Sequence, residues 1–147
     1  MNLKLILVGA GLTLIAISNM IGHFAPPFSI LATPFLLTFI ITEINYKLFQ
    51  LNFHLTVLYS FGLLLLNDIL IRLYAGGTHD SVGKAWILLF SGIALLIAFI
   101  TMLIYSFTTL RNNKSNFSAR TVFTNIATVI LLTIFVSSFY YLYLADF

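Results

Sequence analysis

Apolar residues run through this chain in five long segments, which are separated by short stretches of polar and turn-forming residues. Each segment is close to the ~20 residues with which a helix crosses a hydrocarbon layer ~30 Å thick. No alternation with a period of two runs through the segments, which argues against a barrel. The pattern predicts an all-α integral membrane protein, a compact bundle of about five transmembrane helices in one domain over residues 1–147. The predicted spans are roughly 3–23, 28–46, 52–75, 85–109 and 121–144.

The amino-acid composition also excludes several classes of protein. Only 7% of the residues are charged and the mean hydropathy is +1.07, whereas about a quarter of the residues of a soluble domain are charged. The apolar segments leave no room for a soluble domain beside them. The chain has no cysteine, which excludes disulfides, thiolate metal sites and cysteine nucleophiles.

The seven basic residues predict the orientation of the bundle. With five spans and a cytoplasmic N-terminus, five of them lie inside and two outside, as the positive-inside rule requires. The inside set is Lys4, Lys47, Arg111, Lys114 and Arg120, and the outside set is Arg72 and Lys84. We therefore expect the C-terminus outside and a bacterial inner (cytoplasmic) membrane as the location. The basic residues are dispersed, so we expect no nucleic-acid partner.

The second segment is the least regular of the five. It is short, contains Pro34, and carries Glu43 and Asn45 near its end. A re-entrant hairpin over residues 28–46 is the alternative to a full span. A four-span chain with the same N-terminus would export the basic loop at 111–120, which the positive-inside rule disfavours.

The most informative polar residues lie near the end of the third segment. Asn67, Asp68 and Arg72 fall on one predicted helix, where the last two are four residues apart and can pair. Asp68 lies about 8 to 10 Å inside the outer end of that helix. A lone carboxylate at this depth is costly, so we expect it to pair with Arg72. With His79 and Asp80 of the following loop, these residues form the candidate ligand or partner site.

Two imidazoles and two carboxylates are predicted on the outer side of the membrane. They are His23, Asp68, His79 and Asp80, which together could bind a divalent metal. The spacing contains no motif that places two histidines on one helical face. The alternative is structural, with Asp68 and Arg72 tying helices together and the other residues solvated. No cofactor follows from the sequence.

A second polar group lies near the predicted inner face. It consists of Glu43, Asn45, Lys47 and His54. Interfacial capping and snorkelling account for most of it. The functional alternative is a proton path to Asp68, although His54 and Asp68 are about 21 Å apart along one helix.

Small residues recur every three or four positions in the first and fourth segments. Such faces let helices approach closely, so we expect both to pack against neighbours. The residues are Gly9, Thr13 and Ala16 in the first segment, and Ser91, Ala94, Ala98 and Thr101 in the fourth.

The sequence contains no nucleotide-binding loop, nucleophile elbow or zinc-protease motif. The leading hypothesis is therefore an accessory, sensory or ligand-recognising membrane subunit with a polar site at the outer membrane face. Its partners would be the lipid bilayer and either other membrane proteins or further copies of itself. The alternatives are an intramembrane enzyme, metal-dependent or not, that acts on a lipid, and a small ion-coupled carrier.

Overall fold

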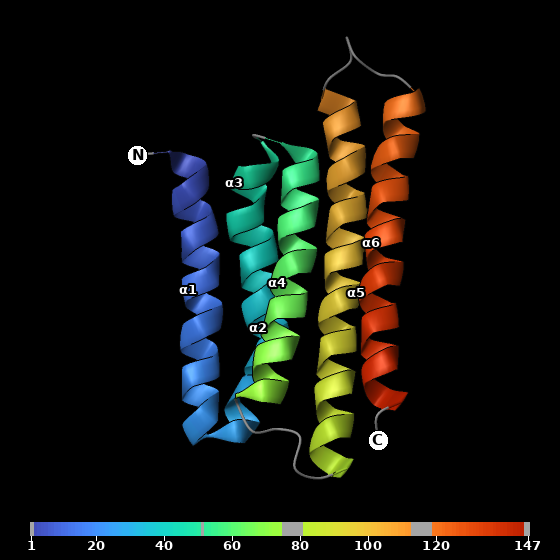
Figure 1. The fold of residues 1–147 in the computed structure, drawn as a ribbon. Helices are drawn as coiled ribbons and strands as arrows, with labels where there is room; N and C mark the ends of the chain where they lie inside the picture. Colours follow the sequence, from blue (N-terminus) through green and yellow to red (C-terminus); the bar gives the residue numbers. More distant parts are fainter. Residues whose placement is uncertain (1, 51, 75–80, 113–118, 146–147) are drawn as a thin grey trace.

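A computed structural model describes residues 2–50, 52–74, 81–112 and 119–145, and these residues form helices with no strand among them (Figure 1). Within the described ranges, five helical segments are long and apolar enough to cross a membrane. The all-helical prediction is confirmed. The elements are α1 (Leu3–Phe24), α2 (Pro26–Phe39), the π-helix η1 (Ile40–Ile44), α3 (Asn45–Phe49), α4 (Phe53–Leu73), α5 (Ser81–Asn112) and α6 (Ala119–Ala145).

The segments α2, η1 and α3 join into one rod without a turn. The apolar part of this rod runs over Pro26–Leu48, and its two ends lie at opposite ends of the bundle (Figure 1). Two prolines, Pro26 and Pro27, begin it, as suits the first turn of a helix, where backbone N–H groups have no intrahelical partner. Residues 28–46 therefore do not form a re-entrant hairpin.

Consecutive long segments run antiparallel, and α4 lies at the centre of the bundle. It contacts α1, α2, α5 and α6. Half of the most apolar part of α4 is buried inside the protein, against 17% of that of α6. The chain ends lie at opposite ends of the bundle (Figure 1).

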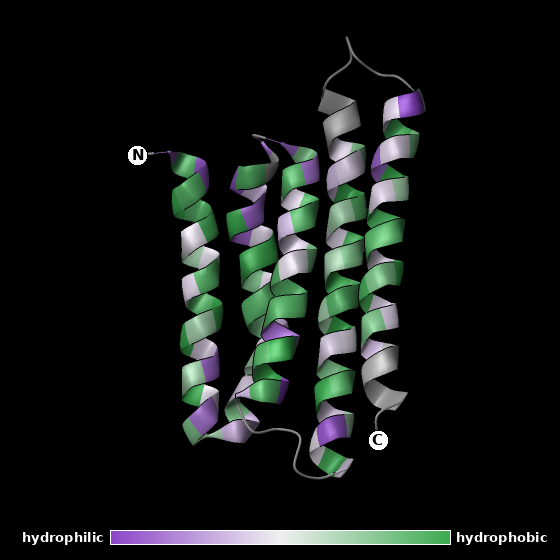
Figure 2. Cartoon of the chain, viewed as in Figure 1, coloured by the Kyte–Doolittle hydropathy of each residue, from purple (hydrophilic) through white to green (hydrophobic). Residues whose placement is uncertain are grey.

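The hydropathy of the residues changes along each helix. Apolar residues fill the middle of the helices, and a hydrophilic patch interrupts α4 in its second half (Figure 2). The core packs large aliphatic and aromatic side chains of several helices together, among them Ile15, Leu37, Ile40, Val57 and Phe61.

The predicted packing face of the first helix is wrong. Thr13 and Ala16 are exposed, and a side chain added at Gly9 would meet nothing within 4 Å. The face that packs on α4 instead carries Gly11 and Ile15, because the Tyr59 ring of α4 lies directly over Gly11. The small-residue face of α5 does pack inward, with Ala94 and Ala98 fully buried.

Candidate polar site in the bundle interior

The candidate site is built around an ion pair within α4. Asp68 and Arg72 are only 1% and 6% exposed. Arg72 Nε donates to Asp68 Oδ2 at 2.7 Å, and Arg72 Nη2 donates to Asp68 Oδ1 at 3.3 Å. Their four-residue spacing places both side chains on one helical face, where the guanidinium can donate hydrogen bonds to both carboxylate oxygens. The predicted pairing is confirmed.

Ser91 extends this pair to a second helix. Its hydroxyl, which belongs to α5, donates to Asp68 Oδ1 at 2.8 Å. Asp68 thus accepts hydrogen bonds at both oxygens from a guanidinium and a hydroxyl. This arrangement offsets the loss of water around a carboxylate placed among apolar helices.

Tyr140 brings α6 to the same cluster. Its hydroxyl is buried and lies beside the Ser91 hydroxyl. Ser91, Asp68 and Arg72 are the groups close enough to act on it electrostatically. The Tyr140 hydroxyl is therefore a buried polar group of α6 beside Ser91 and the ion pair.

Asn67 forms a separate set of bonds on another face of α4. Asn19 of α1 donates from Nδ2 to Asn67 Oδ1 at 3.0 Å. Asn67 Nδ2 donates to Thr33 Oγ1 of α2 at 3.1 Å, and the Thr33 hydroxyl donates to the Ser29 carbonyl at 2.7 Å. All four side chains are buried.

Two consecutive residues therefore link the central helix to its neighbours. Adjacent residues of an α-helix point about 100° apart, so Asn67 faces α1 and α2 while Asp68 faces α5 and α6. A substitution of Asn67 or Asp68 therefore alters the contacts of α4 with two neighbouring helices at once.

His23 lies at the end of the bundle that follows this cluster. Its Nδ1 is 2.9 Å from the Tyr74 carbonyl oxygen, and its ring stacks on the Tyr74 ring with centroids 4.5 Å apart. His79 and Asp80 lie outside the described residues. Among the residues described, no group of three or more histidine, aspartate and glutamate side chains is placed to hold a metal ion. The four-residue metal hypothesis thus stays a prediction.

The second polar group, Glu43, Asn45, Lys47 and His54, is divided between the interior and the surface. Asn45 is buried and donates to the Ser60 hydroxyl, which in turn donates to the Thr56 carbonyl at 2.8 Å. Glu43 and His54, the proposed start of a proton path, are exposed. Neither belongs to the buried cluster around Asp68.

Four members of the site were not predicted as such: Asn19, Thr33, Ser91 and Tyr140. Ser91 was recognised only as part of a small-residue packing face. Asn19 offered the clearest signal, because an amide inside an apolar span is costly unless it finds a partner.

Comparison of the chain with known protein families, with curated proteins and with solved structures finds no match.

Proposed function

We propose that this protein is a five-span integral membrane subunit with an accessory, sensory or ligand-recognising role. The recognition site is the polar cluster around Asp68 and Arg72, with Asn67 beside it. The protein resides in the bacterial inner membrane with its N-terminus in the cytoplasm.

One observation carries the recognition role. Asp68 and Asn67, adjacent on the central helix, are bonded to side chains of α5, α1 and α2, and Tyr140 of α6 lies beside Asp68. A ligand that alters the Asp68–Arg72 pair would shift the packing of α4 against its neighbours. A sensor needs a ligand that binds one arrangement of the helices more tightly than another, because only this difference in affinity can shift the equilibrium between them.

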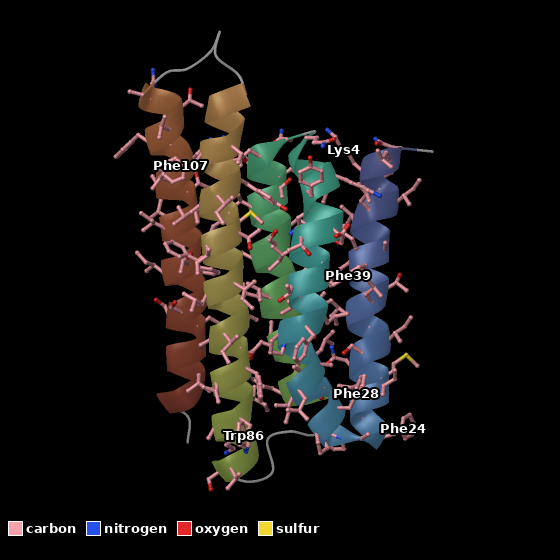
Figure 3. All side chains as sticks on the ribbon, turned by 180° about the vertical axis from the view of Figure 1, so that it is seen from behind. Lys4, Phe24, Phe28, Phe39, Trp86 and Phe107 are labelled. Atoms are coloured by element: carbon pink, nitrogen blue, oxygen red, sulfur yellow. The ribbon has the colours of Figure 1, made fainter. Side chains whose placement is uncertain are left out.

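The distribution of basic residues supports the orientation. Lys4 lies at one end of the bundle, and Phe24, Phe28 and Trp86 lie at the other (Figure 3). Lys47 and Arg120 belong to helix ends on the Lys4 side (Figure 1). Cytoplasmic ends of membrane proteins are enriched in lysine and arginine, and tryptophan and tyrosine favour the interfaces.

A ligand screen on reconstituted protein tests the role. Wild-type protein in nanodiscs is heated with a panel of small polar solutes, and the melting temperature is compared with that of the Asp68→Asn, Arg72→Ala double variant. Recognition at the cluster predicts solutes that raise the melting temperature of the wild type but not of the double variant. Turnover of bilayer lipid by the wild type would favour the enzyme, and solute uptake into proteoliposomes would favour the carrier.

A further inference from the structure

The rod formed by α2, η1 and α3 has an outward face that is apolar over most of its length and charged near one end. Exposed side chains recur along this face every three or four positions: Phe28, Leu31, Phe35, Phe39, Glu43 and Lys47. Phe28 and Phe39 lie along the rod in Figure 3. Thr33 and Asn45, on the other side of the rod, bond to α4. The outward face is therefore not covered by any described helix of the same chain.

Glu43 has an unusual position for a carboxylate. It is exposed, and it belongs to the apolar segment Pro26–Leu48. It lies six residues before α3 ends, which places it about 9 Å inside the end of the rod. Charged residues of a membrane span almost always face the bundle interior or pair with another group, because a lone charge in lipid is costly. Within the described part of the chain, no lysine or arginine lies within ion-pair distance of Glu43.

Lys47 supplies the opposite charge on the same face. It is exposed and follows Glu43 by four residues. Side chains lean toward the start of their helix, so Lys47 leans toward the level of Glu43. Glu43 itself belongs to the π turn η1, which Tyr105 of α5 fixes by donating to the Thr42 carbonyl at 3.3 Å. The rod thus presents a carboxylate and an ammonium group outward from a backbone that is held in place.

We propose that a second copy of the chain covers this face, in a parallel twofold dimer in which Glu43 of each copy pairs with Lys47 of the other. The axis of such a dimer is perpendicular to the membrane, so equal residues lie at equal depth. Glu43 and Lys47 then differ in depth by about 6 Å, the axial separation at which residues four apart on one helix can pair. The proposal rests on the membrane location of the protein and not on its recognition role.

The chemistry of the face favours a second copy over lipid alone. Acyl chains can cover Phe35 and Phe39, but they offer no cation to Glu43. In a twofold interface the same patch meets itself, and a patch with one carboxylate and one ammonium group is complementary to its own copy. Two reciprocal ion pairs would remove four unpaired charges from the edge of the lipid. Aromatic rings of the two copies would meet along the apolar part of the face, where ring contacts add to the association.

Exchange of the two charges between copies tests the dimer. Glu43→Lys and Lys47→Glu chains are labelled with donor or acceptor fluorophores through Ser81→Cys and reconstituted in liposomes, where energy transfer is measured over a range of protein-to-lipid ratios. Each variant alone places like charges opposite each other, so its association should be at least about tenfold weaker than that of the wild type. A mixture of the two variants restores opposite charges at both positions. The mixed pair should therefore associate about as strongly as the wild type.

Arg120→Glu is the matched control for Lys47→Glu. It reverses a basic residue on the Lys4 side of the bundle, but on α6, which packs on α4 and α5. This variant should associate like the wild type. The mixture is a control of another kind, because mixing leaves the like charges within each chain unchanged. Recovery in the mixture therefore requires pairing between copies rather than within one chain.

Phe35→Cys gives a measurement that changes neither charge. Phe35 is 78% exposed, near the middle of the face. A short bifunctional thiol reagent should link two copies of this variant in membranes. Leu131→Cys, at an exposed position of α6, should give a much lower yield of linked dimer. Equal yields for the two variants would count against the dimer.

A wild-type chain that shows no energy transfer at any protein-to-lipid ratio overturns the proposal. Single variants that associate like the wild type also overturn it, as does a mixture that fails to recover. Protein absent from the membrane fraction would overturn the dimer and the proposed membrane location together. A failure of the recognition role would appear separately, as a wild-type protein that dimerises but responds to no solute of the panel.

Discussion

Gly11 gives α4 room to lie against α1. The Tyr59 hydroxyl of α4 reaches across to α1 and donates to the Val8 carbonyl at 2.9 Å, with the Leu7 carbonyl at 3.3 Å. A Cβ atom added at Gly11 would overlap this hydroxyl and would lie 3.3 Å from a methyl group of Leu63. The absent side chain is what allows the contact.

Gly11→Ala should destabilise the protein, because Tyr59 must move away and lose its hydrogen bond to α1. Overpacking of this kind costs about 1 to 3 kcal/mol. Gly9→Ala is the matched control: its methyl group meets no atom within 4 Å, and alanine has the higher helix propensity. Thermal unfolding in detergent compares the two variants. Equal melting temperatures would show that the Gly11 contact is unimportant.

A second prediction about single residues concerns the Asp68–Arg72 pair. Arg72→Ala leaves a carboxylate without its counter-charge and should cost about 3 to 5 kcal/mol. Asp68→Asn combined with Arg72→Ala leaves no unpaired charge and should cost less. A double-mutant cycle on the unfolding free energy measures the coupling. Coupling near zero would mean that water reaches the pair and stabilises each charge alone.

The π-helix η1 sets the register of the second span. Thr33 before it and Asn45 after it both bond to α4, to Asn67 and Ser60. In an uninterrupted α-helix, residues 12 positions apart would point about 120° away from each other. The i→i+5 bonding of a π turn takes up about one extra residue, which reduces this angle to roughly 20°. The irregular turn therefore lets both polar side chains face the same neighbour.

Deleting Thr42 from η1 tests this account. The rod would become a regular α-helix with Thr33 and Asn45 11 positions apart, which again leaves about 20° between them. Both polar pairs with α4 should survive, so the deletion should unfold at nearly the same temperature as Thr42→Ala, which keeps the chain length at an exposed position. Inserting one alanine after Thr42 should instead turn Asn45 by about 100° relative to Thr33, so that one polar pair is lost at a cost of about 1 to 3 kcal/mol. Equal unfolding temperatures for the deletion and the insertion would refute this account.

The sequence predicted some elements well because their signals are local. Runs of about 20 apolar residues are sufficient to predict helices in a membrane, and the spacing of Asp68 and Arg72 predicted their pairing. The partners Asn19, Ser91 and Tyr140 depend on how each helix is rotated against the next. That rotation is set by packing between segments and by features such as η1, which no periodicity within one segment reveals.

The whole bundle has two chemically different ends, and α5 runs from one to the other. Its 32 residues span about 48 Å, which exceeds the hydrocarbon thickness. Ser81 begins this helix and Asn112 ends it. Both ends should therefore reach water on opposite sides of a membrane.

Cysteine labelling tests the proposed orientation, and the chain has no cysteine of its own to interfere. In intact cells, an impermeant maleimide should label Ser81→Cys from outside, whereas Asn112→Cys should react only after the membrane is permeabilised. Labelling of both from the same side would contradict the five-span arrangement. The reverse pattern would keep the five spans and invert the orientation.

The ion pair of α4 also has a consequence for biosynthesis. Asp68 and Arg72 are one helical turn apart, so the last two turns of a nascent α4 already carry both charges when they enter the bilayer. The pair needs no other helix to neutralise it. Asn67 binds α1 and α2, which are synthesised earlier, whereas Ser91 and Tyr140 follow later in the chain. A ribosome-bound fragment ending after α4 can thus insert and assemble with its predecessors before α5 and α6 close over Asp68.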